Sequence, residues 1–207
     1  MDLQVAIDRV TLERAVDLAR QLDDQVDIIE LGTSLIKDYG VLQIHQALPA
    51  LRHAKLLLDI KTIDEGEYEF DKGFAAGDIL TVMGAASRGT LEKVYALTQQ
   101  RQKQMFIDMM EINDVKTGQI VDFPQAIYGI HHAKDAQTGF DAAATVAAFH
   151  HQYPGVQHIS VAGGIDLAMA QKLAQQGIAE SVIVGSAIVK TADPVATAQK
   201  FMEVMHS

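Results

Sequence analysis

The sequence contains no cysteine among its 207 residues. Disulfide bonds, thiolate metal sites and thiol nucleophiles are therefore excluded. Basic residues are also scarce, because 17 lysines and arginines stand against 27 aspartates and glutamates, for a formal net charge of −10 at pH 7. This charge disfavours a phosphate-backbone partner such as DNA but allows one small basic pocket for a small anion. We therefore expect no nucleic-acid partner.

Long apolar runs and several familiar motifs are missing as well. No uninterrupted apolar stretch approaches the ~20 residues that span a bilayer, and segment 1–10 lacks a basic leader followed by an apolar region. We expect no membrane partner and a cytoplasmic location. The absence of a P-loop, a dinucleotide-binding fingerprint, HExxH and G-x-S-x-G argues against nucleotide hydrolysis, zinc proteolysis and serine-esterase chemistry.

Short β-rich runs alternate with amphipathic segments along the whole chain. In segment 11–22, for example, Leu12, Ala15, Ala19 and Leu22 recur at helical spacing. Alternation of this kind predicts βαβ units and a parallel sheet. The eight runs are 3–8, 26–32, 55–60, 78–83, 104–110, 126–131, 158–164 and 181–186.

Eight such units predict a (β/α)8 TIM barrel that forms a single domain over residues 1–207. The length is near the lower bound of roughly 200 residues for that fold, so the loops must be short. A doubly wound open sheet is the alternative, but it usually has about five or six strands. Segment 111–124, after the fifth strand, is irregular, and we expect no full helix there.

An acidic residue or a histidine stands at or near the end of five predicted strands, as Asp8, Glu30, Asp59, Asp108 and His131. In a parallel barrel this end carries the catalytic face. Buried carboxylates are costly, so groups that converge on one rim need a cation, a lysine or hydrogen bonds to stay charged. Any one of them could cap a helix or lie in solvent, but the five together indicate a site.

The segment LLLDIKTIDEG, residues 56–66, places three charges directly after a buried strand. Side chains alternate along a strand, so Asp59 and Lys61 should share one face, and Asp64 follows as a potential helix N-cap. A surface salt bridge is the simpler interpretation, but the leucines before it favour a pair held at the barrel mouth.

Glycines end the last two predicted strands, in VAGGI (161–165) and VIVGSAI (182–188). Glycine allows backbone N–H groups to approach an anion, and the loops after strands seven and eight are the usual phosphate site of such barrels. The sequence therefore predicts a phosphate-binding site there.

The sequence resembles the orotidine 5′-phosphate decarboxylase suprafamily essentially end to end. The segments that carry the resemblance, in order and spacing, are LQVAID, DIIELGTSLI, LLLDIKTIDEG, and VAGGI with VIVGSAI. The pattern Asp-x-Lys-x-x-Asp after strand three is the signature of that suprafamily. The resemblance implies that Glu30 and Asp59 bind Mg²⁺, that Asp8 and Lys61 line the substrate site, and that His131 is an acid/base. A mostly carboxylate rim also suits Mg²⁺ better than zinc.

The same resemblance implies a phosphate-binding backbone at Gly164, Gly185 and Ser186. In the suprafamily the counterpart of Asp64 reaches into the site of the neighbouring subunit. The resemblance therefore implies a homodimer in which Asp64 contributes across the interface.

Two branches of the suprafamily fit the sequence. One is an aldehyde-lyase that reversibly condenses D-ribulose 5-phosphate with formaldehyde to 3-hexulose 6-phosphate through an enediolate, and the other decarboxylates 3-keto-L-gulonate 6-phosphate. Three positions resemble the aldehyde-lyase: Asp108 on strand five, Ala162 before Gly163, and Ser186 in the phosphate loop. Lys134, in contrast, keeps the positive charge of an arginine that is typical of the decarboxylase. We prefer the aldehyde-lyase. A catalytically silent sugar-phosphate-binding protein is a third hypothesis, against which the intact acidic set argues.

Overall fold

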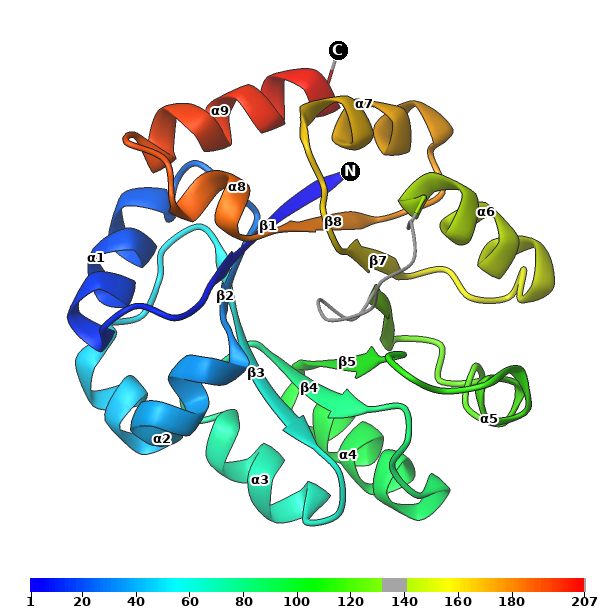
Figure 1. The fold of residues 1–207 in the computed structure, drawn as a ribbon. Helices are drawn as coiled ribbons and strands as arrows, with labels where there is room; N and C mark the ends of the chain where they lie inside the picture. Colours follow the sequence, from blue (N-terminus) through cyan, green and yellow to red (C-terminus); the bar gives the residue numbers. More distant parts are fainter. Residues whose placement is uncertain (132–140, 207) are drawn as a thin grey trace.

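The computed structural model describes residues 1–131 and 141–206, in which eight parallel strands form a closed ring (Figure 1). Each strand pairs with the next along the chain, and β1 pairs with β8 to close the ring. The predicted (β/α)8 barrel is therefore confirmed. The strands are β1 Asp2–Ile7, β2 Ile28–Leu31, β3 Lys55–Thr62, β4 Ile79–Met83, β5 Gln104–Asp108, β6 Ile127–His131, β7 Ile159–Ala162 and β8 Ser181–Val184.

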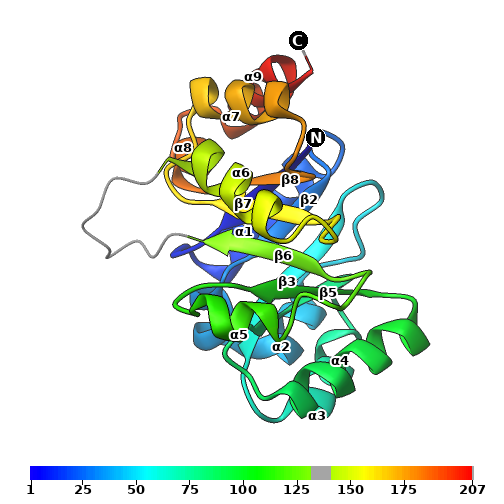
Figure 2. The same ribbon diagram turned by 90° about the vertical axis from the view of Figure 1, so that its right-hand side faces the viewer.

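Helices surround this ring, and Figure 2 shows that both termini lie on the side of α7 and α9. Within the described residues, no helix is long and apolar enough to cross a membrane. Only the short α5 follows β5, which confirms that no full helix forms there. The helices are α1 Leu12–Leu22, α2 Thr33–Ala47, α3 Gly66–Gly73, α4 Arg88–Arg101, α5 Asp114–Gly118, α6 Ala142–Gln152, α7 Leu167–Gln176, α8 Ser186–Val189 and α9 Pro194–Met205.

Helix α1 shows how the sequence produces these elements. The Thr11 side chain accepts a hydrogen bond from the Arg14 N–H and caps the helix start. The apolar residues at helical spacing, among them Ala15, Ala19 and Leu22, are buried against the barrel. Each large aliphatic side chain buried in this way contributes ~1.5–3 kcal/mol to the free energy of unfolding.

Inside the ring, an apolar layer lies below a polar one. The apolar layer is the cluster of Ile28, Leu57, Ile79, Phe106 and Ile127. Side chains point to the same face every two residues along a strand. Two residues after Ile28, Leu57 and Phe106, toward the carboxyl end, the side chains of β2, β3 and β5 therefore point inward again. Those positions are acidic, which places three carboxylates directly above the core: Glu30, Asp59 and Asp108.

Five of the observed strands, β1, β2, β5, β7 and β8, end one or two residues earlier than the sequence predicted. Asp8 follows β1, and the glycines of segments 163–164 and 185 follow β7 and β8. Gly163 has φ 117° and Gly164 has φ 64°, which no strand adopts. These residues therefore belong to the loops at the carboxyl end of the barrel.

Candidate active site

A cavity of about 790 Å³ opens at the carboxyl ends of the strands, and all eight strands or the loops after them contribute to its wall. Asp64 is not among the lining residues, and Lys134 lies outside the described residues. The other predicted site residues line the cavity: Asp8, Glu30, Asp59, Lys61, Asp108, His131, Ala162, Gly163, Gly164, Gly185 and Ser186.

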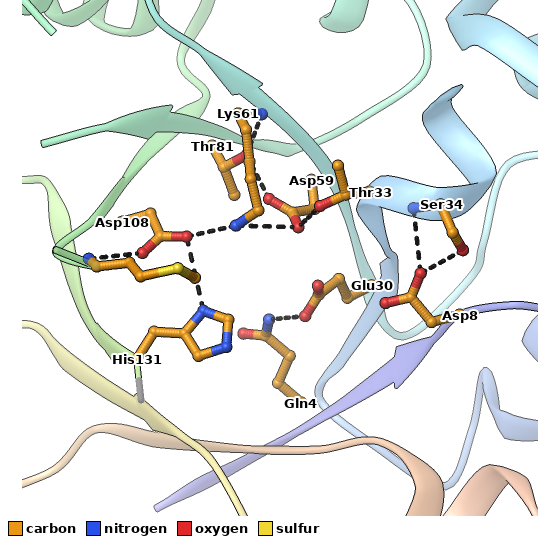
Figure 3. Close-up of polar contacts among 11 residues, drawn as sticks. Gln4, Asp8, Glu30, Thr33, Ser34, Asp59, Lys61, Thr81, Asp108 and His131 are labelled. Atoms are coloured by element: carbon orange, nitrogen blue, oxygen red, sulfur yellow. Dashed lines mark hydrogen bonds and ion pairs between the residues drawn. The ribbon is translucent and has the colours of Figure 1, made fainter. Parts of the chain in front are cut away.

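Lys61 lies between two carboxylates in this cavity (Figure 3). Its Nζ donates a hydrogen bond to Asp108 Oδ2 and lies 3.4 Å from Asp59 Oδ2. Burial lowers the pKa of Lys61, but the charges of Asp59 and Asp108 outweigh burial and raise it above its ordinary value. Lys61 therefore stays protonated at neutral pH and acts through its charge.

The backbone bends to bring Lys61 into this position. The pairing of β3 with β4 shifts register between Leu58 and Thr62, and Lys61 has a φ of 48°. Such a left-handed conformation costs an L-residue about 1–2 kcal/mol. The Lys61 N–H donates to Thr81 Oγ1 over 2.8 Å, which holds the bend. A register shift of this kind re-aims a side chain next to a functional site.

Two threonine hydroxyls fix the Asp59 carboxylate. Thr81 Oγ1 donates to Oδ1 over 2.7 Å, and Thr33 Oγ1 donates to Oδ2. Thr81 belongs to β4 and Thr33 begins α2, so the carboxylate is held from two separate elements. Asp59 is buried, which makes this support important for its orientation.

Glu30 is the second buried carboxylate on this side of the cavity. Gln4 Nε2 donates to Glu30 Oε2 over 2.6 Å. Burial raises the pKa of Glu30, and the charge of Asp59 raises it further, to about 8, although the Gln4 hydrogen bond opposes the shift. A cation near both carboxylates would relieve this repulsion.

His131 ends β6 and faces Asp108, which ends β5. His131 Nδ1 lies 3.6 Å from Asp108 Oδ2, and Asp108 Oδ1 accepts a hydrogen bond from the Met110 N–H over 2.9 Å. Burial raises the pKa of Asp108, but the approach of His131 and Lys61 outweighs burial and lowers it to about 2. An ionised Asp108 therefore faces the Nδ1 side of the ring and leaves Nε2 toward the cavity (Figure 3).

Asp8 lies at the start of α2, apart from Lys61 and its partners Asp59 and Asp108 (Figure 3). Its Oδ1 accepts hydrogen bonds from the backbone N–H of Ser34, over 3.1 Å, and from the Ser34 hydroxyl. A Cβ atom at Gly32, the helix N-cap, would overlap the Asp8 carboxylate. Glycine at position 32 therefore allows the carboxylate to sit against the helix start, where the helix dipole favours negative charge.

The loops after β7 and β8 form another part of the wall. Gly163 and Gly164 both have a positive φ, and no atom lies within 4 Å of a Cβ atom built on Gly164. Ser186 is exposed and begins the short α8 directly after Gly185. The glycines leave open space beside the backbone, which is what a phosphate needs in order to approach it.

Asp64 is not a helix N-cap, contrary to the expectation from the sequence. Helix α3 begins at Gly66, and its N-cap residue Glu65 makes no side-chain cap hydrogen bond. Asp64 Oδ1 accepts a hydrogen bond from the Glu65 N–H over 2.9 Å instead. The Asp64 side chain is exposed on the loop between β3 and α3.

Sequence reasoning missed four polar residues of this site: Gln4, Thr33, Ser34 and Thr81. Strand alternation could have found Gln4, because it lies four residues before Asp8 and therefore at the same position of the two-residue repeat. Thr81 likewise is a polar residue within the apolar β4. Thr33 and Ser34 carry no such signal, because both types are common at helix starts.

The donor set suits a hard divalent cation that takes part of its shell from water or substrate. No group of three or more histidine, cysteine, aspartate or glutamate side chains is gathered closely enough to hold a metal in residues 1–131 and 141–206. Glu30 and Asp59 offer two carboxylates, and burial together with the charge of Asp59 raises the pKa of Glu30, as expected for a pair that a cation would stabilise. Mg²⁺ is commonly held by one or two carboxylates and keeps several waters.

Comparison with known proteins identifies the family. The model of the orotidine 5′-phosphate decarboxylase / HUMPS family matches residues 1–201. The chain belongs to this family. A curated relative, 3-hexulose-6-phosphate synthase from Mycobacterium gastri, is 37% identical to this chain over 206 residues, and the match covers 97% of each chain.

Two solved structures agree with the barrel. The crystal structure of 3-hexulose-6-phosphate synthase from Salmonella typhimurium has a TM-score of 0.89 and 30% identity, over 100% of this chain and 99% of that one. The structure of 3-keto-L-gulonate-6-phosphate decarboxylase from Vibrio cholerae has a TM-score of 0.81 and 24% identity, over 99% and 97% of the chains, and is similar in fold.

Proposed function

We propose that this chain is an aldehyde-lyase that reversibly condenses D-ribulose 5-phosphate with formaldehyde to give 3-hexulose 6-phosphate. The Lys61 ammonium between Asp59 and Asp108, in the same cavity as Glu30, is the observation that carries the proposal. A fixed positive charge in a partly closed cavity suits a reaction that develops negative charge on a sugar oxygen. The relatives named 3-hexulose-6-phosphate synthase, at 37% and 30% identity, support it.

In this proposal His131 performs the proton transfers. The Asp108 carboxylate beside Nδ1 keeps a proton on that nitrogen, so Nε2 can remove a proton from C1 of ribulose 5-phosphate. The resulting enediolate forms a bond from C1 to the formaldehyde carbon, and the formaldehyde oxygen takes up the proton that His131 removed from C1. Lys61 offsets the negative charge of the enediolate, and the glycine loops after β7 and β8 hold the phosphate.

Glu30 and Asp59 would hold Mg²⁺ in this proposal. The raised pKa of Glu30, to which burial and the charge of Asp59 contribute, supports a cation between the two carboxylates. Bound Mg²⁺ supplies positive charge that polarises the ketose carbonyl. The residues around it fix the two carboxylates, Gln4 on Glu30 and the two threonines on Asp59.

The decarboxylase branch is the lower-ranked alternative. It needs the same enediolate but reaches it by losing CO₂, so the shared acidic cluster does not separate the two. Asp108, Ala162 and Ser186 stand where that branch typically has glutamate, threonine and arginine, and the decarboxylase structure from Vibrio cholerae is only 24% identical to this chain.

Parallel assays decide between these functions. The purified protein with Mg²⁺ should consume formaldehyde in the presence of ribulose 5-phosphate and should release no CO₂ from 3-keto-L-gulonate 6-phosphate. The opposite pair of results would reverse the ranking. Exchange of the C1 proton of ribulose 5-phosphate with solvent tests the third hypothesis, because a silent binding protein would catalyse none.

Substitution of Asp59 tests the proposed metal site. Asp59→Ala should lower formaldehyde consumption at least ~100-fold while leaving the fold intact, because a carboxylate at the rim supports little of the core. Asp27→Asn is the control, since Asp27 accepts a hydrogen bond from the Leu3 N–H at the other end of the barrel. Loss of helical circular dichroism in Asp59→Ala would mean that Asp59 is structural.

We further propose a homodimer in which Asp64 completes the site of the partner subunit. Asp64 is exposed and does not line the cavity of its own chain. Two large apolar side chains near it, Ile63 and Tyr68, are 47% and 64% exposed. Exposed apolar surface next to polar residues is typical of a protein interface. The cytoplasmic location stays a prediction from the sequence.

A further inference from the structure

Gln4 is a buried polar residue of the cavity whose amide oxygen has no role in the reaction proposed above. It lies in β1, is 1% exposed and lines the cavity. Its Nε2 donates to Glu30 Oε2, whereas its Oε1 has no hydrogen-bond partner among the described residues. An unpaired buried amide oxygen is costly, and most buried polar atoms in proteins have a partner.

The contact with Glu30 fixes which way the amide points. Turning the amide over would place Gln4 Oε1 against Glu30 Oε2, and once Glu30 is ionised, as a metal ligand must be, these two acceptor oxygens cannot form a hydrogen bond with each other. Oε1 is therefore directed away from Glu30, on the side of the amide that faces the His131 ring in Figure 3. Gln4 and His131 both line the cavity, so a ligand that reaches this buried oxygen must approach it from the cavity.

An amide oxygen accepts hydrogen bonds and donates none, so its partner must carry an O–H or N–H group. A ketose phosphate offers several hydroxyl groups, whereas formaldehyde has no such donor. We propose that Gln4 is a substrate-binding residue whose Oε1 accepts a hydrogen bond from a hydroxyl of the bound sugar phosphate while its Nε2 orients Glu30. This inference rests on the proposed function in so far as the cavity takes a ketose phosphate.

The test replaces Gln4 with a side chain of similar length that forms neither hydrogen bond. Gln4→Met is compared with Gln176→Met, because Gln176 also has a buried Oε1 without a partner and donates through Nε2, over 2.9 Å to the Ala143 carbonyl. Gln176 does not line the cavity, so the control repeats the chemical change outside the site. Calorimetry measures three Kd values, with Mn²⁺ used in place of Mg²⁺ as the probe metal. They are the Kd of Mn²⁺ alone, of ribulose 5-phosphate at saturating Mn²⁺, and of inorganic phosphate.

In Gln4→Met we expect the Kd of Mn²⁺ to rise about tenfold, because outer residues that orient metal ligands commonly have this effect. The Kd of ribulose 5-phosphate should also rise about tenfold through the lost hydroxyl contact. The Kd of inorganic phosphate should stay within about twofold, because Gln4 belongs to β1 and not to the glycine loops proposed to hold the phosphate. Gln176→Met should leave all three unchanged.

Other outcomes overturn the inference. An unchanged Kd for ribulose 5-phosphate in Gln4→Met, with the wild type binding it normally, would remove the hydroxyl contact. A lower melting temperature with all three Kd values unchanged would make Gln4 purely structural. If the wild type itself fails to bind ribulose 5-phosphate, the proposed function fails instead, so the two failures are distinguishable.

Discussion

Glu30 shows, for a single residue, how the barrel holds a carboxylate that is unfavourable in the metal-free protein. Burial and the neighbouring Asp59 raise its pKa from 4.5 to about 8. An acid whose pKa is higher in the folded than in the unfolded protein stabilises the fold fully below the unfolded pKa. That contribution is lost as the pH rises from about 4.5 to about 8. The metal-free protein therefore loses stability over this range because of Glu30.

The variant Glu30→Gln tests this argument, because glutamine does not titrate. In EDTA, the free energy of unfolding of the wild type should fall relative to Glu30→Gln between about pH 5 and about pH 8, by on the order of a few kcal/mol. Urea denaturation at the two pH values measures it. Added Mg²⁺ should stabilise only the wild type at the higher pH. The exposed Glu203, changed to glutamine, is the control and should show neither effect.

Among the secondary-structure elements, the strands could be predicted in greater detail than the loops that follow them. Asp59 lies two residues after Leu57 in β3, so strand alternation alone predicts that both point into the barrel. Alternation gives no sign of the positive φ at Lys61 or of the register shift between Leu58 and Thr62. The N-cap prediction for Asp64 was wrong because α3 begins two residues later.

Helix α2 offers a prediction about a single element. Gly32 has ordinary extended dihedral angles, so alanine fits its backbone, but the added Cβ would overlap the Asp8 carboxylate and lie 2.7 Å from Oδ1. Gly32→Ala should therefore fold normally and lower kcat/KM for ribulose 5-phosphate about tenfold or more, through displacement of Asp8. Gly118→Ala is the control, because no atom lies within 4 Å of its Cβ position. Equal kcat/KM in the two variants would exclude a role for the position of Asp8.

For the molecule as a whole, closure of the ring determines which polar groups meet. Gln4 contacts Glu30 across the pairing of β1 with β2, and Thr33 contacts Asp59 from the start of α2, the helix that precedes β3. The sequence predicts the ring and the acidic strand ends, because both depend on local periodicity. It does not predict these partners, because they lie 26 residues apart and depend on the final packing.

Assembly is the remaining property of the whole molecule, and subunit complementation tests it. Lys61→Met and Asp64→Asn should each abolish formaldehyde consumption as a homodimer. If Asp64 acts in the partner's site, a heterodimer of the two variants contains one site with both native residues. Random pairing makes about half of the dimers heterodimers, so co-expression should restore roughly a quarter of the wild-type activity.

The same mixture gives a different result if Asp64 acts within its own chain. Every site of the heterodimer then lacks either Lys61 or Asp64, so co-expression restores no activity. A mixture of Lys61→Met with Lys61→Arg is the matched control, because both substitutions affect the same residue and no pairing recreates a native site. Recovery in the first mixture alone requires that subunits share sites, because only a partner can supply the aspartate that the chain with native Lys61 lacks.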